Sequence, residues 1–195
     1  MEREKTLVLI KPDGVQRAII GKIISRFEDT GLKVAAIKMV WVDDILAKDH
    51  YPVAEEWAKQ VYEKTKTAYA SQGKEFKYKT PREYGQRIQN MLINFIKEGP
   101  VVAMILEGPH AIEITRKLLG NTEPRQAMPG TIRGDFISTE SYAQADPNDR
   151  AVRNLIHASD SKENAEREIS LWFESHEIYD YKNIHDHLSP TKKKK

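Results

Sequence analysis

Cysteine is absent from the 195 residues of this chain. Disulfides, thiolate metal sites and cysteine nucleophiles are therefore excluded. Long hydrophobic runs are missing too, since none approaches the roughly 18 apolar residues that span a membrane. Residues 1–5 carry charges of both signs and lead directly into an apolar segment, which does not suit a secretory signal. Together these absences predict a cytoplasmic protein.

A glycine-rich phosphate-binding loop is also lacking. The segment from Gly14 to Ile23 resembles a P-loop at first sight, but six residues separate Gly14 from Gly21, and Ile23 stands where magnesium needs a hydroxyl. The G-x-G-x-x-G pattern of dinucleotide sites does not occur either. Any nucleotide must therefore be held mainly by side chains.

Charge of one sign does not dominate the chain. The formal net charge is +2, but Lys192 to Lys195 supply four positive charges, so the remainder of the chain stands at −2. This balance argues against a basic nucleic-acid-binding protein. The tail at 192–195 is predicted to be a solvated end, with a weak contact to polyanions as the alternative. The length and the 39% hydrophobic content suit one globular domain.

The hydrophobic pattern predicts alternating strands and helices. Strands are expected at 6–10, 34–42, 101–106 and 131–137. Helices are expected at 20–31, from 43, and at 55–67, 81–97, 108–120 and beyond 160, where Asp160 and Glu163 suggest a capping box. Residues 11–14 read as a turn, and 138–150 as an exposed loop. This order fits a split β-α-β unit with helices on one sheet face, or a doubly wound parallel sheet.

Histidine is the remaining residue type whose side chain can act as a nucleophile or bind a metal. His185 and His187 could bind a metal, but they lie near a polar terminus and lack a clear third ligand, so a solvated segment is the preferred interpretation. His157 is different, because two apolar residues precede it and a polar capping run follows. A neutral imidazole is a competent nucleophile near physiological pH.

Four segments, in order, carry a resemblance to the nucleoside diphosphate kinase family. The segment Asn154–Ser161, NLIHASDS, resembles the active-site signature of that family, and the match extends over residues 5–50 and 98–180. The other three segments are TLVLIKPDG at 6–14, EGPVVAM at 98–104 with Glu107 and Gly108, and PGTIRGDF at 129–136.

The resemblance implies a ferredoxin-like α+β domain, with an antiparallel four-stranded sheet and extra helices, over residues 1–191. Insertions would lie within 52–98 and 138–150. It further implies a homo-oligomer, usually a hexamer, and Mg²⁺ carried by the nucleotide phosphates, with no direct protein ligand. The reaction would be ping-pong transfer of a γ-phosphate from a nucleoside triphosphate to a nucleoside diphosphate, through phosphohistidine at His157.

The resemblance also assigns roles to single residues. Glu168 would fix the tautomer of His157, Ser159 would lie beside this pair, and Tyr51 would help to hold the histidine and the terminal phosphate. The remaining binding residues would be Asn154 for the ribose, Lys11 for phosphate and ribose, and Arg116, Thr122 and Arg133 for phosphates. Taken singly, each of these has an ordinary structural role as its alternative, such as a surface charge, a cap or a turn residue.

Position supports the assignment of Glu168 without the resemblance. This carboxylate follows Ala165 by three residues and precedes Trp172 by four, so it lies beside the apolar stripe of the last predicted helix. A carboxylate there needs a partner. The resemblance implies that this partner is His157, and a purely structural interpretation gives a backbone group or an arginine instead.

The residue that stacks on the base is left open. The family uses an aromatic residue within the first insertion, where an ungapped count places Ile88, with Tyr84 nearby. A non-catalytic nucleotide-binding regulatory relative and a phosphatase that hydrolyses the phosphohistidine are the competing hypotheses. Base preference, the choice between hexamer and tetramer, and the purpose of the insertions are also left open.

Overall fold

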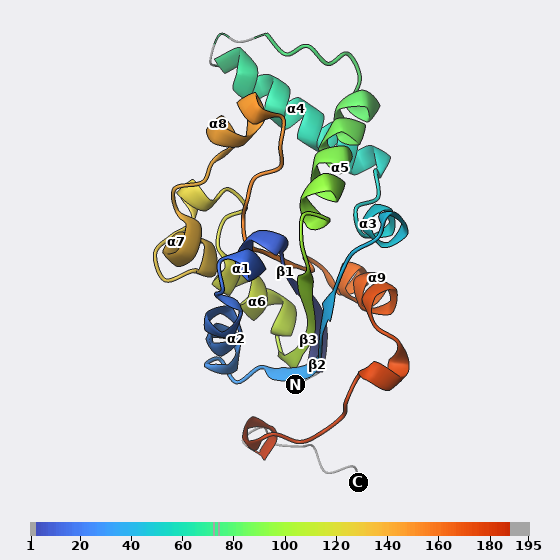
Figure 1. Ribbon diagram of the computed structural model, residues 1–195, viewed down its shortest axis with the longest axis vertical. Coiled ribbons are helices and arrows are strands. Elements are labelled where there is room, and N and C mark those ends of the chain that lie inside the picture. Colours follow the sequence, from blue (N-terminus) through green and yellow to red (C-terminus); the bar gives the residue numbers. More distant parts are fainter. Residues whose placement is uncertain (1–2, 72, 74, 188–195) are drawn as a thin grey trace.

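The structure, a computed structural model, describes residues 3–71, 73 and 75–187 (Figure 1). The proposed tail at 192–195 lies outside them. Four strands form one antiparallel sheet in the order β2-β3-β1-β4. They are β1 (Arg3–Ile10), β2 (Lys33–Val40), β3 (Val101–Pro109) and β4 (Ile156–Ala158). The predicted α+β fold is confirmed, and the doubly wound parallel alternative is excluded.

Both faces of the sheet are buried, which explains why its central strands read as continuous apolar runs. Successive side chains of a strand point to opposite faces. In β1, Val8 and Ile10 enter one hydrophobic core, whereas Leu7 and Leu9 enter the other. The two cores therefore share the central strands β1 and β3.

Helices cover both faces, not the single face that the split unit had suggested (Figure 1). One core receives side chains from α2 (Ile20–Glu28), α6 (Ala111–Leu119) and α7 (Ile132–Ile137). The other receives them from α3 (Asp44–His50), α9 (Lys162–Trp172) and the C-terminal end of α5 (Pro81–Ile96). The short helix α1 (Pro12–Gln16) follows β1 directly.

Segments 52–98 and 138–150 fold together at one end of the molecule (Figure 1). The first contains α4 (Glu55–Ser71) and the whole of α5, and the second contains α8 (Tyr142–Ala145) and the 3-10 turn Asp146–Asn148. Arg87 joins them, because its Nη2 lies 2.6 Å from Asp149 Oδ1. Between α4 and α5 lies a cluster of aromatic rings, made of Tyr62, Tyr69, Phe76, Tyr78 and Tyr84.

Several predicted element boundaries were wrong for local reasons. Segment 131–137 is the helix α7, not a strand, because the Thr131 hydroxyl accepts a hydrogen bond from Gly134 N and caps it. The fourth strand is instead β4, which contains His157. Helix α9 is capped by Ser161, so the expected box of Asp160 and Glu163 does not form.

Smaller differences concern the first and third strands. Residues 11–14 begin the helix α1, with Pro12 at its first position, instead of forming an isolated turn. Strand β3 continues to Pro109, and α6 begins at Ala111 after a left-handed residue, His110. The helix predicted from Gly108 therefore starts three residues later.

The segment after α9 returns along the outer edge of the sheet. It contains the 3-10 turns Ser175–Glu177 and Ile184–His187. Tyr179 N donates to Ala35 O at 2.8 Å, and His185 packs against Gly31, which has a φ of 82°. The side chain of His187 is outside the described part of the chain. In that part, no helix is both long and apolar enough to cross a membrane.

Candidate active site

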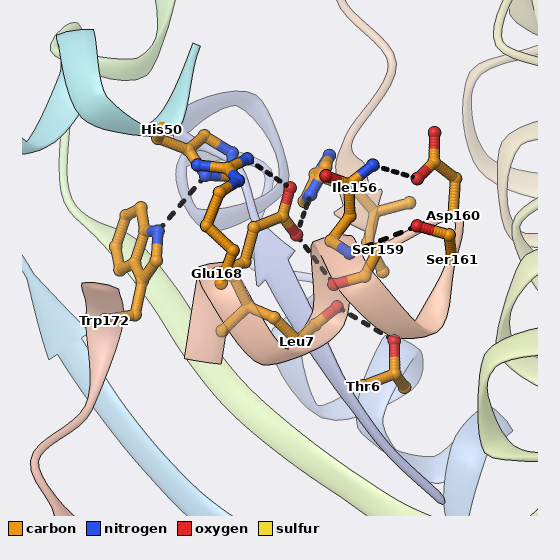
Figure 2. A network of polar contacts seen from close by, with 12 residues as sticks. Thr6, Leu7, His50, Ile156, Ser159, Asp160, Ser161, Glu168 and Trp172 are labelled. Atoms are coloured by element: carbon orange, nitrogen blue, oxygen red, sulfur yellow. Dashed lines mark hydrogen bonds and ion pairs between the residues drawn. The ribbon is translucent and has the colours of Figure 1, made fainter. Parts of the chain in front are cut away.

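His157 lies in the middle of β4, opposite Leu9 of β1, and its side chain is 24% exposed. Its Nε2 is 2.9 Å from Oε2 of Glu168, which α9 places beside the strand. Ser159 Oγ donates to the same carboxylate oxygen at 2.6 Å (Figure 2). A single buried oxygen thus accepts from two neighbouring side chains.

This arrangement determines which nitrogen of His157 can react. Burial alone would raise the pKa of Glu168, but the hydrogen bonds from His157 and Ser159 outweigh it, so this pKa lies below its usual range. The group is therefore a carboxylate at neutral pH and can only accept hydrogen bonds. Nε2 of His157 must then carry the hydrogen, which leaves a lone pair on Nδ1.

A second histidine lies against the first. His50, at the end of α3, packs edge-on to His157 with ring centroids 4.7 Å apart, and it is 3% exposed. Trp172 Nε1 donates to His50 Nδ1 at 3.2 Å (Figure 2). Burial, together with the neighbouring positive charges, lowers the pKa of His50 well below its ordinary value, so this ring is neutral.

Tyr51 follows His50 and completes this side of the site. Its ring centroid lies 4.5 Å from that of His50, and burial raises the pKa of its phenol. Within the described protein, both Tyr51 Oη and His50 Nε2 are buried without a hydrogen-bond partner. Buried polar atoms of this kind call for a functional explanation, because leaving them unpaired is costly.

Among the described residues, one group of side chains has the spacing of a metal site. Ligand atoms of His50, His157 and Glu168 lie within 4.8 Å of one another. However, the indole of Trp172 is a pure donor, so His50 Nδ1 accepts and Nε2 carries the hydrogen. His50 therefore offers no free lone pair, and the group fits a hydrogen-bond network better than a cation.

Lys11 follows β1 and is 6% exposed. Its Nζ donates to Asn154 Oδ1 at 2.8 Å and lies 5.3 Å from the centre of the Phe95 ring. Asn154 Nδ2 in turn donates to Thr122 O at 3.0 Å. Burial and the Arg133 charge, opposed by Asp13, lower the pKa of Lys11 to about 8.

Arg133 contacts the backbone of Asn154. It lies in α7, and not at the start of a strand as the sequence had predicted. Each of its three side-chain nitrogens donates to a backbone carbonyl. The acceptors are Asn154 O at 3.1 Å, Gly120 O at 2.9 Å and Ile156 O at 2.7 Å. Burial and the nearby Arg116 charge lower the pKa of Arg133 to about 10, so it stays charged at neutral pH.

A histidine oriented by a carboxylate, beside a group of cations, has the parts of a phosphoryl-transfer site. The family model described as nucleoside diphosphate kinase matches residues 4–74 and 66–178. The chain belongs to the nucleoside diphosphate kinase family. The predicted family and the predicted enzyme class are both confirmed.

Relatives of this kinase share most of its length. The nucleoside diphosphate kinase of Pyrobaculum aerophilum is 45% identical over 182 residues, which are 91% of this chain and 99% of the relative. That of Pyrococcus furiosus is 44% identical over 192 residues, or 98% of this chain and 96% of the relative. The correspondence therefore includes the segments that hold both insertions.

Solved structures agree with the sequence comparison. The crystal structure of the NDP kinase from Pyrobaculum aerophilum has a TM-score of 0.87 at 43% identity, with 92% of this chain and all of that one covered. A transition-state mimic of the Borrelia burgdorferi enzyme, with bound vanadate and ADP, has a TM-score of 0.75 at 40% identity. It covers 94% of this chain and 95% of that one.

The kinase fold gathers most of the predicted site residues by direct contact. His157, Glu168 and Ser159 form one group, and Lys11, Asn154, Thr122 and Arg133 form the other. Arg133 joins the two groups through Ile156, the residue before His157. Tyr51 is linked to the first group through the His50 ring. Arg116, which belongs to α6 and is exposed, lies near Arg133.

The two candidates for base stacking have different surroundings. Tyr84 is 5% exposed inside the aromatic cluster, where its hydroxyl donates to Thr65 Oγ1 at 3.2 Å. Ile88 is partly buried against the small cluster of Met91, Phe95 and Ala151. Tyr84 thus belongs to the packing between α4 and α5, whereas Ile88 packs against the cluster that contains Phe95, the ring beside Lys11 Nζ.

The sequence analysis gave no role in the site to His50 or Phe95, and it placed Trp172 only in the apolar stripe of the last helix. His50 and Trp172 lie 122 positions apart, so their hydrogen bond leaves no local pattern. The signal within reach was the position of His50 at a helix end, immediately before Tyr51. Phe95 reads as an ordinary apolar residue of α5, and only the fold places it against Lys11.

Proposed function

We propose that this kinase transfers the γ-phosphate of a nucleoside triphosphate to a nucleoside diphosphate through a phosphohistidine at His157. The observation that carries the proposal is the hydrogen bond between His157 Nε2 and Glu168, because it leaves the Nδ1 lone pair as the nucleophile. The Borrelia burgdorferi relative, captured with vanadate and ADP, supports the same class of reaction.

The chemistry takes two steps at one site. Nδ1 attacks the γ-phosphorus, a nitrogen–phosphorus bond forms, and the bond to the bridging oxygen breaks, so the nucleoside diphosphate leaves with that electron pair. The ring then carries a positive charge, which the Glu168 carboxylate opposes across Nε2. In the second step a terminal oxygen of another diphosphate attacks the phosphorus, the nitrogen–phosphorus bond breaks, and its electron pair returns to Nδ1 of the neutral imidazole.

The remaining site residues bind and orient the nucleotide in this proposal. Lys11, Arg116 and Arg133 neutralise the phosphates, which is the main demand of phosphoryl transfer. Arg133 uses three of its five N–H groups on the backbone, so one N–H on each terminal nitrogen is left for an oxygen ligand. Thr122 contacts a phosphate, and Asn154 and Lys11 reach the ribose.

Tyr51 and Ser159 act on the histidine itself. The unpaired Tyr51 hydroxyl would donate to the phosphoryl group on His157, and Ser159 keeps the Glu168 carboxylate in place. Ile88 is the residue we assign to the base, because Tyr84 is enclosed in the aromatic cluster. An aliphatic contact of this kind selects weakly among bases, so we expect broad base tolerance.

Magnesium is proposed to arrive with the nucleotide and to be held by its phosphates. Mg²⁺ prefers several oxygen ligands. The one potential ligand group found in the described chain contains two imidazoles and a single carboxylate, which suits this ion poorly. No protein residue is therefore assigned as a metal ligand.

We also propose a homo-oligomer, with a hexamer favoured, located in the cytoplasm. The later part of β2, beyond the Ala35 carbonyl that accepts from Tyr179 N, supports association, because Ile37, Met39 and Trp41 on and after this strand are 51%, 58% and 70% exposed. An apolar edge strand is a ready site for pairing with another copy. Residues 1–191 would form one kinase domain, with insertions within 52–98 and 138–150.

A labelling experiment tests the function. The protein is mixed with γ-labelled ATP and magnesium, without an acceptor, and label on the protein is measured. We expect an acid-labile, base-stable phosphoprotein that passes its label to added GDP. A protein that binds ATP but never becomes labelled would refute the covalent mechanism, and phosphate release without an acceptor would indicate a phosphatase.

A further inference from the structure

The residue between Asn154 and the catalytic strand has an unusual backbone conformation. Leu155 has a φ of 65° and is fully buried. Ile156 N donates to Asn154 O at 2.7 Å across it, which closes a γ-turn with positive φ. This turn is rare and strained for a residue with a side chain, because Cβ approaches the backbone. Such strain persists only where the surroundings hold it.

The surroundings of Leu155 hold it through both of its backbone polar groups. Asp13 Oδ2 accepts from Leu155 N at 3.0 Å, and Lys11 N donates to Leu155 O at 2.8 Å. Arg133 holds the carbonyls on either side, those of Asn154 and Ile156. Asp13 supplies the side-chain contact to the Leu155 amide.

Asp13 is a costly residue to bury at this position. It is 4% exposed in α1, and within the described chain its Oδ1 has no hydrogen-bond partner. Burial raises its pKa, opposed by the nearby Lys11 charge. A buried carboxyl with one unpaired oxygen is expensive if its purpose is stability alone. The proposed mechanism uses the residues on either side of the turn but not Asp13.

We propose that Asp13 is a positioning residue for phosphoryl transfer. Its carboxylate holds the Leu155 turn, and this turn fixes the positions of Asn154 and the nucleophile His157. Asn154 is the first residue of the turn, and its side chain accepts from Lys11 Nζ. His157 follows Leu155 by two residues, in a strand of three residues that pairs with β1. A relaxed turn would displace both groups, and a misplacement of about 1 Å can cost about 100-fold in rate.

The inference rests on the phosphohistidine proposal and is tested with the same label. Asp13→Ala removes the acceptor for the Leu155 amide. Asp13→Asn is the matched control, because its amide oxygen still accepts from Leu155 N while the charge beside Lys11 is lost. The single-turnover rate of protein labelling is measured at saturating ATP, and nucleotide Kd and thermal unfolding are measured in parallel.

We expect Asp13→Ala to lower the labelling rate by about 10-fold or more, with Kd changed by less than about threefold. Asp13→Asn should keep the rate within about threefold of wild type, which a role for charge alone would not allow. Should Asp13→Ala fail to fold, Asp13→Ser, which is too short to reach the Leu155 amide, takes its place and should show the same loss.

Two outcomes would overturn the inference. One is a folded Asp13→Ala or Asp13→Ser protein that is labelled at the wild-type rate. The other is an Asp13→Asn protein that loses as much rate as Asp13→Ala, since the charge and not the turn would then matter. A wild-type protein that takes up no label would instead refute the proposed function, so the two failures are distinguishable.

Discussion

Glu168→Gln isolates the electrostatic part of the mechanism. Oε2 of Glu168 accepts from both His157 and Ser159, and a glutamine oxygen in the same place can accept both hydrogen bonds. The tautomer of His157 would then be retained, and the negative charge alone would be lost. Glu168→Ala removes the charge and the hydrogen bonds together, so the pair separates the two contributions.

The expected size follows from the geometry. The positive charge that develops on the ring lies 2.9 Å from Oε2. Coulomb's law at an effective dielectric constant of about 20 gives about 6 kcal/mol for full unit charges at this distance. The ring is 24% exposed, and its charge is only partly developed in a loose transition state. We therefore expect the carboxylate charge to stabilise the transition state by about half of this Coulomb energy. A loss of about 3 kcal/mol corresponds to about 100-fold in rate.

The assay is single-turnover labelling from γ-labelled ATP at saturating nucleotide, because it reports the first chemical step without product release. Glu168→Gln should be about 100-fold slower than wild type, and Glu168→Ala slower still. Nucleotide Kd should change little, since Glu168 faces the histidine. A Glu168→Gln protein labelled at the wild-type rate would refute the assigned role of the carboxylate charge.

Three further predictions concern other parts of the site. His157→Ala should abolish label uptake and transfer while leaving nucleotide binding largely intact, and measured product formation at the wild-type rate would contradict the mechanism. Lys11, with a pKa of about 8, is charged below that pH and neutral above it, so Kd for ATP should rise as pH passes through about 8. Lys11→Arg should remove this dependence, and an equal rise in that variant would assign it to another group. Ile88→Ala should weaken nucleotide binding with little change in the rate at saturation, whereas Tyr84→Phe should leave binding unchanged. Calorimetry measures the nucleotide Kd of both variants. A Kd raised by Tyr84→Phe and unchanged by Ile88→Ala would assign the base contact to Tyr84.

Local pattern determined much of the fold and the choice of site residues. Segments 6–10 and 101–106 read as strands because continuous apolar runs suit a sheet buried on both faces. Pro81 marked the first turn of α5, and Asp43 the cap of α3. The four motifs contain five of the nine predicted site residues, namely Lys11, Arg133, Asn154, His157 and Ser159.

The sequence pattern gave the wrong element type for α7 and missed β4, because the local signals in these two segments are weak or mixed. Segment 131–137 has β-branched residues at three of its positions, yet the Thr131 cap and the packing of Ile132 into the core favour a helix. Strand β4 spans only three residues, too few for a period-two pattern to be recognised. It exists because β1 supplies its hydrogen-bond partners.

The amino-acid sequence by itself determined which side chains could react, bind phosphate and build the two cores. The tertiary structure decided their states, because these depend on partners far away along the chain. Lys11 and Asn154 meet across 143 positions, and His50 and Trp172 across 122. The hydrogen on His157 Nε2, the neutral ring of His50 and the strained Leu155 turn all follow from contacts that form only when the sheet and its helices pack together.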